Sequence, residues 1–201
     1  MTFLEIARSR HSAREFDPSR PLTESEKESI LEAGELAPSS RNIRPVCLIP
    51  VDDIDIIRSL ASCKDSGTRA LESATFAVVV AADARMSDVW IEDCSIASIM
   101  MQLEAEELGI GSCWIQVRLR EGSGMPAVQR IRDTIFLGEG MDVLSIIAFG
   151  KQRSLPFLVQ RMLHAQLVQA AADHDVDDIL DRLRPGVEPG IGVQDGDAQP
   201  G

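Results

Sequence analysis

Ala74-Thr75-Phe76-Ala77-Val78-Val79-Val80-Ala81-Ala82 is the longest apolar run in this chain of 201 residues. It contains three β-branched valines and is apolar at successive positions, a pattern typical of a strand covered on both faces. At nine residues it is far shorter than the roughly 20 needed to cross a bilayer. The run therefore predicts a central strand of a globular domain.

A long helix is predicted to follow this strand, from about Ser87 to Leu108. Apolar residues recur in it at helical spacing: Cys94, Ala97, Met101, Leu103 and Leu108, with Ile91, Ile96 and Met100 widening the stripe. A stripe this wide indicates burial on several sides. Gly109 is a natural terminator.

The remaining elements alternate along the chain in an α+β order. Thr2-x-x-Glu5 and Thr23-x-x-Glu26 have the form of capping boxes, so each is expected to start a helix. Further strands are expected at 45–51, 112–117 and 143–150, and further helices at 53–62, 127–137, 156–172 and 176–183. We expect one domain over residues 1–184 and a disordered acidic tail over 185–201.

The charge of the chain argues against several classes of partner. The net charge is -12, so a phosphate backbone or an anionic membrane would repel the chain, and neither nucleic acid nor membrane is expected as a partner. The N-terminal residues lack the basic start and apolar stretch of a secretory signal, which favours a cytoplasmic location.

The cysteines and the usual motifs give no sign of a metal site or a hydrolase. Cys47, Cys63, Cys94 and Cys113 lie far apart without a neighbouring histidine, so no metal site is expected, and we expect small buried apolar residues. No G-x-S-x-G, Walker loop or G-x-G-x-x-G is present.

Two basic clusters could bind a small anion. Arg10-His11-Ser12-Ala13-Arg14 combines forked guanidinium donors with a hydroxyl, which suits phosphate oxygens. Lys151-Gln152-Arg153 directly follows the last expected strand, where ligand sites commonly form. Taken alone, each cluster is more often a solvated surface loop.

Two other polar segments allow both a functional and a structural interpretation. Pro38-Ser39-Ser40-Arg41-Asn42 could bind the edge of a heterocycle, but these residues are equally good turn formers. Glu92 and Asp93 could serve acid/base chemistry, although carboxylates in a first helical turn are explained more simply by the helix dipole.

Five segments together resemble the nitroreductase family of FMN-dependent enzymes, in order and in spacing. They are Arg10 to Arg14, Ala37 to Asn42, Glu92 to Ser98, Leu108 to Ile115 and Gly150 to Arg153. Each motif alone is weak, whereas their combination over roughly Thr2 to Arg153 is specific.

The resemblance implies an α+β fold with a central mixed or antiparallel sheet, helices around a long central helix, and an intertwined homodimer with FMN at the subunit interface. Residues implied to hold the phosphate and ribityl chain are Arg10, His11, Ser12, Arg14, Lys151 and Arg153. Residues implied to line the flavin ring are Pro38, Ser39, Ser40 and Asn42 of the other subunit. The stretch Trp114, Ile115 and Gln116 is implied to pass along the flavin, its backbone offering a donor to N5.

The implied activity is hydride transfer from NAD(P)H through the flavin to nitroaromatics, quinones or similar small electrophiles, with no essential catalytic side chain. Alternatives are a specialised flavoenzyme of the same fold, such as a reductive dehalogenase or a flavin-fragmenting enzyme, and an FMN-binding protein without turnover. Nitroreductase-like chains usually continue with Gln-Pro-aromatic where this chain has Arg44-Pro45-Val46, and the added cation could favour anionic acceptors or the phosphate of NADPH.

Overall fold

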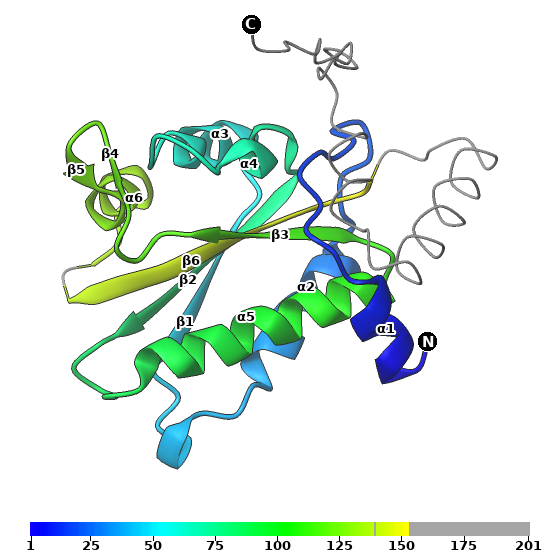
Figure 1. Ribbon diagram of the computed structural model, residues 1–201, viewed down its shortest axis with the longest axis horizontal. Helices are drawn as coiled ribbons and strands as arrows, with labels where there is room; N and C mark the ends of the chain where they lie inside the picture. Colours follow the sequence, from blue (N-terminus) through cyan, green and yellow to red (C-terminus); the bar gives the residue numbers. More distant parts are fainter. Residues whose placement is uncertain (139, 153–201) are drawn as a thin grey trace, which may run out of the picture. The chain divides into compact units, whose positions relative to one another are not determined.

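The computed structural model describes residues 1–138 and 140–152 (Figure 1). The helices expected at 156–172 and 176–183 lie outside the described residues, and so do the acidic tail at 185–201 and Arg153. The predicted domain end at residue 184 stays a prediction. None of the helices within the described ranges has the length and apolar character needed to cross a membrane.

A four-stranded antiparallel sheet forms the centre of the fold. Its strands, in spatial order, are β1 (Val46–Val51), β2 (Phe76–Asp83), β6 (Met141–Gly150) and β3 (Gly111–Gln116). The α+β class and the antiparallel central sheet are confirmed, and the run at Ala74 to Ala82 supplies the inner strand β2. The strand expected at 45–51 is present as β1, but it is not the buried strand that its apolar residues suggest, because it lies at the sheet edge and is only partly covered.

Helices cover both faces of this sheet (Figure 1). One face carries α1 (Phe3–Ser9), α2 (Glu24–Glu35) and the long helix α5 (Trp90–Glu107); the other carries α3 (Ile54–Ala61), α4 (Arg69–Ser73) and α6 (Ala127–Ile135). Three small elements complete the described fold: a 3₁₀ helix η1 (Ser40–Asn42) and a hairpin of β4 (Glu121–Gly122) and β5 (Met125–Pro126). The sequence patterns predicted neither this hairpin nor α4.

Helix starts follow the capping residues read from the sequence. Thr2 and Thr23 both form complete capping boxes, with Glu5 and Glu26 as their partners. Asp53 caps α3 by accepting hydrogen bonds from two backbone N–H groups of its first turn. These side chains satisfy donors that the first turn of a helix otherwise leaves unpaired.

Alternate residues of β2 enter two separate cores. Ala77, Val79 and Ala81 face α3, α4 and α6, while Val78 and Val80 face α2 and α5. This two-sided burial explains why the strand is apolar at every position from Phe76 to Ala82. A bulge in β6 interrupts the pairing between Val80 and Ala81 of β2 and their partners.

The chain between α1 and α2 lies directly against the ends of β3 and β6. The N–H of Ala13 donates to the carbonyl of Ser112 at 2.9 Å, and the N–H of Asp17 donates to the carbonyl of Lys151 at 2.8 Å. Gly111 and Gly150 are paired at this corner of the sheet. The approach requires both glycines, because a Cβ on Gly111 would meet that of Ala13 at 2.9 Å.

We predict that Gly150→Ala lowers the free energy of unfolding by about 1–3 kcal/mol, because the new methyl group overpacks this corner. Its Cβ would lie 2.6 Å from Cβ and Cγ of Phe16, which is itself buried. Chemical denaturation measures the loss. Gly138→Ala is the matched control, since a Cβ there meets nothing within 4 Å, and an equal loss in both variants would contradict the packing argument.

Candidate functional site

The two basic segments predicted from the sequence lie together at the corner of the sheet. Ser12 forms a parallel bridge with Ser112 at the start of β3. His11 Nε2 lies 3.3 Å from Nε2 of Gln152, and His11 Nδ1 lies 3.1 Å from the carbonyl oxygen of Ser9. The loop after α1 and the segment after β6 therefore form one surface, which we call the basic corner (residues 10–14 and 151–152).

The guanidinium groups of the basic corner have no carboxylate partner within the described part of the chain. Arg14 is exposed, and its Nη1 makes a long contact of 3.4 Å with the carbonyl of Ser12. Arg10 is half-buried and forms no ion pair with a described residue. No carboxylate of a described residue compensates either positive charge, which suits an anionic ligand.

Lys151 is already paired, unlike the two arginines. Its ammonium hydrogen-bonds the carboxylate of Glu26, and both side chains are about one-fifth exposed. Burial raises the pKa of Glu26, but hydrogen bonds from Lys151 and the Thr23 cap outweigh it, so the pKa lies below its usual value. The sequence alone did not reveal this competitor for a phosphate ligand.

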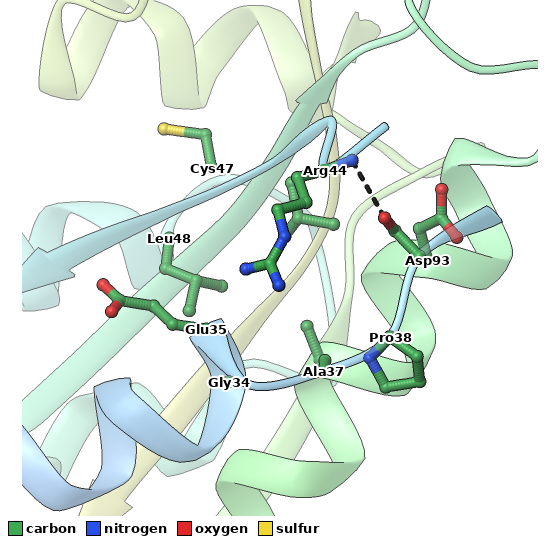
Figure 2. A pocket seen from close by; sticks show the side chains of 11 residues that line it. Gly34, Glu35, Ala37, Pro38, Arg44, Cys47, Leu48 and Asp93 are labelled. Atoms are coloured by element: carbon green, nitrogen blue, oxygen red, sulfur yellow. Dashed lines mark hydrogen bonds between the residues drawn. The ribbon is translucent and has the colours of Figure 1, made fainter. Parts of the chain in front are cut away.

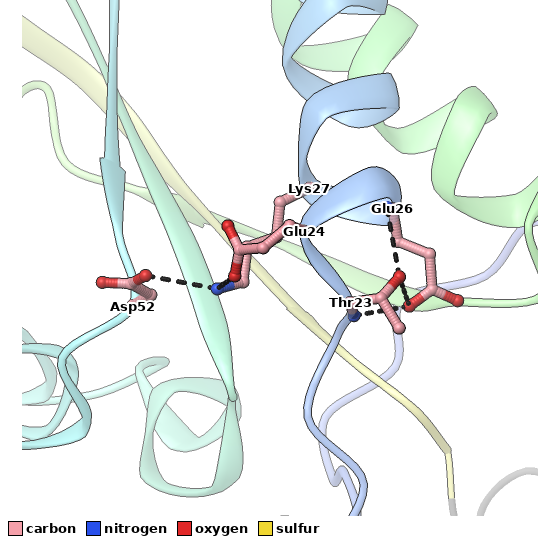
Figure 3. A network of polar contacts seen from close by, with 5 residues as sticks. All are labelled: Thr23, Glu24, Glu26, Lys27 and Asp52. Atoms are coloured by element: carbon pink, nitrogen blue, oxygen red, sulfur yellow. Dashed lines mark hydrogen bonds and ion pairs between the residues drawn. The ribbon is translucent and has the colours of Figure 1, made fainter.

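A network beside this pair holds the start of α2 (Figure 3). Lys27 Nζ donates to Glu24 Oε1 at 2.8 Å and to Asp52 Oδ2 at 3.2 Å, across to the loop after β1. The hydrogen bond to Glu24 raises the pKa of Lys27, with Asp52 contributing against the effect of burial. The network fixes the start of α2. Because α2 carries Glu26, it also positions the ion-pair partner of Lys151.

One cation near Arg14 was missed by sequence reasoning. Arg69, at the start of α4, forms an ion pair with Glu15 and lines a cavity of about 340 Å³ that Arg14 also lines. No local motif marks Arg69, because only the tertiary fold brings it to the basic corner.

Asp93 holds the second candidate segment in place. Its side chain is buried, at 3% exposure, and Oδ1 accepts the N–H of Ser40 at 2.8 Å. Its Oδ2 accepts the hydroxyl of Ser87 at 3.2 Å. The helix-dipole interpretation of Asp93 is therefore incomplete, since this carboxylate fixes the loop that precedes β1. Its neighbour Glu92 is exposed, as that interpretation expects.

Three residues of this loop adopt a left-handed backbone conformation. Arg41, Asn42 and Arg44 have φ values of 52°, 54° and 54°. Such a conformation costs roughly 1–2 kcal/mol per residue outside glycine, so it needs support from the surroundings. Ser39 Oγ gives that support by accepting the N–H of Arg44 at 2.9 Å, and Arg44 Nε donates to Asn42 Oδ1 at 3.1 Å.

A cavity of about 410 Å³ opens beside this loop (Figure 2). Pro38, Ser39 and Arg44 line one side of it, and Cys47 and Leu48 of β1 contribute as well. We call it the loop cavity.

Cys47 contradicts the expectation that all four cysteines are buried, because its position on the edge strand leaves it exposed. Cys63, Cys94 and Cys113 are buried as expected. Burial raises the pKa of Cys94 to about 12.

The predicted flavin-facing stretch occupies the edge strand β3. Ile115 is buried in the core, so it can offer only backbone groups to a ligand. The Ser112 carbonyl points away from β6 toward Ala13, and antiparallel alternation therefore turns the N–H groups of Trp114 and Gln116 to the same open side. Trp114 Nε1 donates to Gln116 Oε1 at 3.0 Å, and Gln116 Nε2 donates to the Arg118 carbonyl at 3.1 Å.

The candidate residues thus form two groups. The first joins the basic corner to the free edge of β3. The second comprises Pro38 and Ser39, which line the loop cavity, together with Ser40 and Asn42 of the same loop. No hydrogen bond or ion pair within residues 1–138 and 140–152 links the two groups directly. Arg153, predicted to join the first group, lies outside these ranges.

Comparison with known proteins identifies the class. The model of the Nitroreductase family matches residues 7–66. A putative NADH dehydrogenase/NAD(P)H nitroreductase of Archaeoglobus fulgidus is 32% identical over 151 residues, which cover 73% of this chain and 83% of the relative. A protein of the same description from Methanothermobacter thermautotrophicus is 29% identical over 153 residues, covering 75% of this chain and 77% of the relative.

A solved structure supports the same assignment. The FMN-dependent nitroreductase of Clostridium difficile R20291 superposes with a TM-score of 0.73 at 36% identity, covering 76% of this chain and 89% of that one. The fold and the sequence together define a nitroreductase-like oxidoreductase. The chain belongs to the nitroreductase family.

We predict that Asp93→Ala lowers the free energy of unfolding by about 1.5–3 kcal/mol, because it removes a buried charged acceptor from the Ser40 N–H and the Ser87 hydroxyl. Denaturant unfolding measures the loss. Glu92→Ala is the control: it removes an exposed carboxylate from the same helical turn and should cost less than about 1 kcal/mol. Equal losses of stability in the two variants would show that Asp93 acts only through the helix dipole.

Proposed function

We propose that this protein binds FMN and uses NAD(P)H to reduce quinones, nitroaromatics or similar small electrophiles. The observation that carries the proposal is the basic corner, where the guanidinium groups of Arg10 and Arg14 have no carboxylate partner among residues 1–138 and 140–152 and lie beside the open edge of β3. The names of the relatives, NAD(P)H nitroreductase and FMN-dependent nitroreductase, support the same chemistry.

The donors at the basic corner fit the phosphate of FMN. Two guanidinium groups and the Ser12 hydroxyl offer forked and single donors to a dianion. His11 lies beside them, with its ring nitrogens facing the Ser9 carbonyl and the Gln152 amide. Lys151 would add positive charge from its pair with Glu26, and Arg153 would complete the group. The acidic chain would repel a phosphate elsewhere on its surface, so this concentration of positive charge also localises the ligand.

The open edge of β3 fits the rim of a flavin ring. The outward N–H groups of Trp114 and Gln116 would donate to ring nitrogen and oxygen atoms, with the Gln116 side chain held by Trp114 and by the Arg118 carbonyl. When bound, FMN supplies the two-electron chemistry that side chains lack, so that quinone, NAD(P)H and a proton give quinol and NAD(P)⁺. The chain itself positions the reactants and provides the electrostatic environment.

The separation of the two residue groups supports a site built from two copies of the chain. The loop of Pro38, Ser39, Ser40 and Asn42 would then cover the ring of FMN held by the basic corner of a second copy. Ile96 and Ile99 are exposed at 38% and 39% on successive turns of α5. An exposed apolar pair on a helix whose opposite side packs into the core suits a subunit interface.

The absorption spectrum and NAD(P)H oxidation test the central proposal. We expect the purified protein to show oxidised-flavin bands, to release FMN on heating, and to oxidise NAD(P)H when a quinone or nitroaromatic is added. A coloured protein without turnover on any acceptor would favour a non-catalytic FMN-binding role or a specialised reaction. A colourless protein that does not bind added FMN would refute the proposal.

A double variant, Arg10→Ala with Arg14→Ala, tests whether the basic corner binds the phosphate of FMN. The double variant should lose FMN during dialysis at moderate salt, because two charge-assisted contacts disappear. The control is the Arg8→Ala, Arg20→Ala double variant, which removes the same charge from two exposed positions nearby. Flavin retention in the first variant, or equal loss in both, would contradict the assignment.

We predict that Ile99→Asp weakens or abolishes the dimer, because it places a carboxylate in the proposed apolar interface. Sedimentation velocity should show a shift toward monomer, and bound FMN should fall with the dimer fraction. Ile54→Asp is the control, since Ile54 is exposed at 42% on α3. A monomeric wild-type protein that keeps its FMN would disprove a shared site.

A further inference from the structure

Arg44 presents a free cationic group to the loop cavity. Its backbone N–H and its Nε are held by Ser39 Oγ and Asn42 Oδ1. The terminal Nη1 and Nη2 groups form no hydrogen bond or ion pair with any described residue. Figure 2 shows this guanidinium extending into the space bounded by Leu48 and Ala37.

Two carboxylates also line the loop cavity, and neither neutralises Arg44. Asp93 is buried and already accepts hydrogen bonds on both of its oxygens. Glu35 is exposed at the end of α2, and it forms no ion pair with Arg44. Arg44 therefore offers two terminal NH2 groups, unpaired with any described residue, to a ligand in the cavity.

Comparison with Arg41 shows that this arrangement is specific to position 44. Both residues are exposed and have almost the same left-handed φ, 52° and 54°. The guanidinium of Arg41 is paired with Asp88, whereas that of Arg44 lines the cavity. The left-handed backbone and its two hydrogen bonds thus hold the head group of Arg44 in place before a ligand arrives, which lowers the entropy lost on binding.

We propose that Arg44 is a specificity-determining residue that binds an anionic group, a carboxylate, sulfonate or phosphate, on the molecule entering the loop cavity. This inference rests on the proposed function, because Pro38 and Ser39 line the same cavity and would bring the cofactor next to it. The anion belongs either to the electron acceptor or to the 2′-phosphate of NADPH. The guanidinium suits each of them, since both present oxygen pairs to its fork.

Steady-state kinetics with matched substrates test the role of Arg44 in the full-length, FMN-loaded protein. The acceptor pair is 4-nitrobenzoate and 4-nitrobenzamide, which differ in charge but little in shape. The donor pair is NADPH and NADH, compared with 4-nitrobenzamide as the acceptor. In Arg44→Gln we expect kcat/KM to fall roughly tenfold for the charged member of one pair, a moderate value because the site is open to solvent.

Two further variants distinguish a direct contact made by Arg44 from a general electrostatic effect of positive charge near the cavity. Arg44→Lys keeps the charge, so it should retain part of the preference for the anionic member. Arg41→Gln removes the same charge three positions away and should leave the ratio between charged and neutral members within about twofold. An equal fall in Arg41→Gln and Arg44→Gln would overturn the contact, and so would unchanged ratios for both pairs in Arg44→Gln.

Calorimetric titration of the purified protein with 4-nitrobenzoate separates failure of this inference from failure of the proposed function. Wild type should bind 4-nitrobenzoate, or NADP⁺ in a parallel titration, roughly tenfold more tightly than Arg44→Gln, with the difference shrinking as salt is raised. Equal binding of both ligands by the two proteins refutes the anion contact even if turnover is normal. A wild type that binds no FMN and reduces neither acceptor refutes the proposed function, while the titration still decides on Arg44.

Discussion

The hydrogen bond from the N–H of Ala13 to the carbonyl of Ser112 is the constraint on which the rest of the site depends. It places the loop after α1 against the free edge of β3, and the glycines at 111 and 150 leave room for that approach. Without it, Arg10 and Arg14 would be ordinary surface cations. With it, two guanidinium groups lie beside a strand edge whose N–H groups are unpaired in the ladder.

The second half of the candidate site depends on a buried carboxylate rather than on the sheet. Asp93 binds the Ser40 N–H from within α5, the longest helix of the described fold. The loop that carries Ser39 and Asn42 therefore keeps its shape through a contact between segments more than fifty positions apart. We propose that association between two copies of the chain brings the two halves of the site together.

Strong local patterns made much of the fold predictable. The apolar run around Val78 and the capping boxes at Thr2 and Thr23 depend on neighbours in sequence, and the structure has the expected elements at each. The small hairpin at Glu121 and the exposure of Cys47 were not predictable, since the first depends on packing against residues 63 to 65 and the second on strand order.

The site shows the same division between local and tertiary information. Sequence motifs indicated the basic residues, and the structure gathers those within residues 10–14 and 151–152 at one corner. Sequence motifs could not indicate that Lys151 is paired with Glu26, or that Asp93 accepts a hydrogen bond from the loop before β1, because each contact joins distant segments. Both are pairwise contacts that only the folded chain creates.

The left-handed loop before β1 has a consequence for how such a protein can diverge. Its unusual backbone is maintained by Asp93 and by the hydroxyl of Ser39, neither of which depends on the identity of the side chain at position 44. That side chain can be exchanged while the frame around it persists. Single replacements at the cavity wall can then change the substrate preference with little loss of stability or of cofactor binding. Related chains can in this way accept new substrates while the fold stays the same.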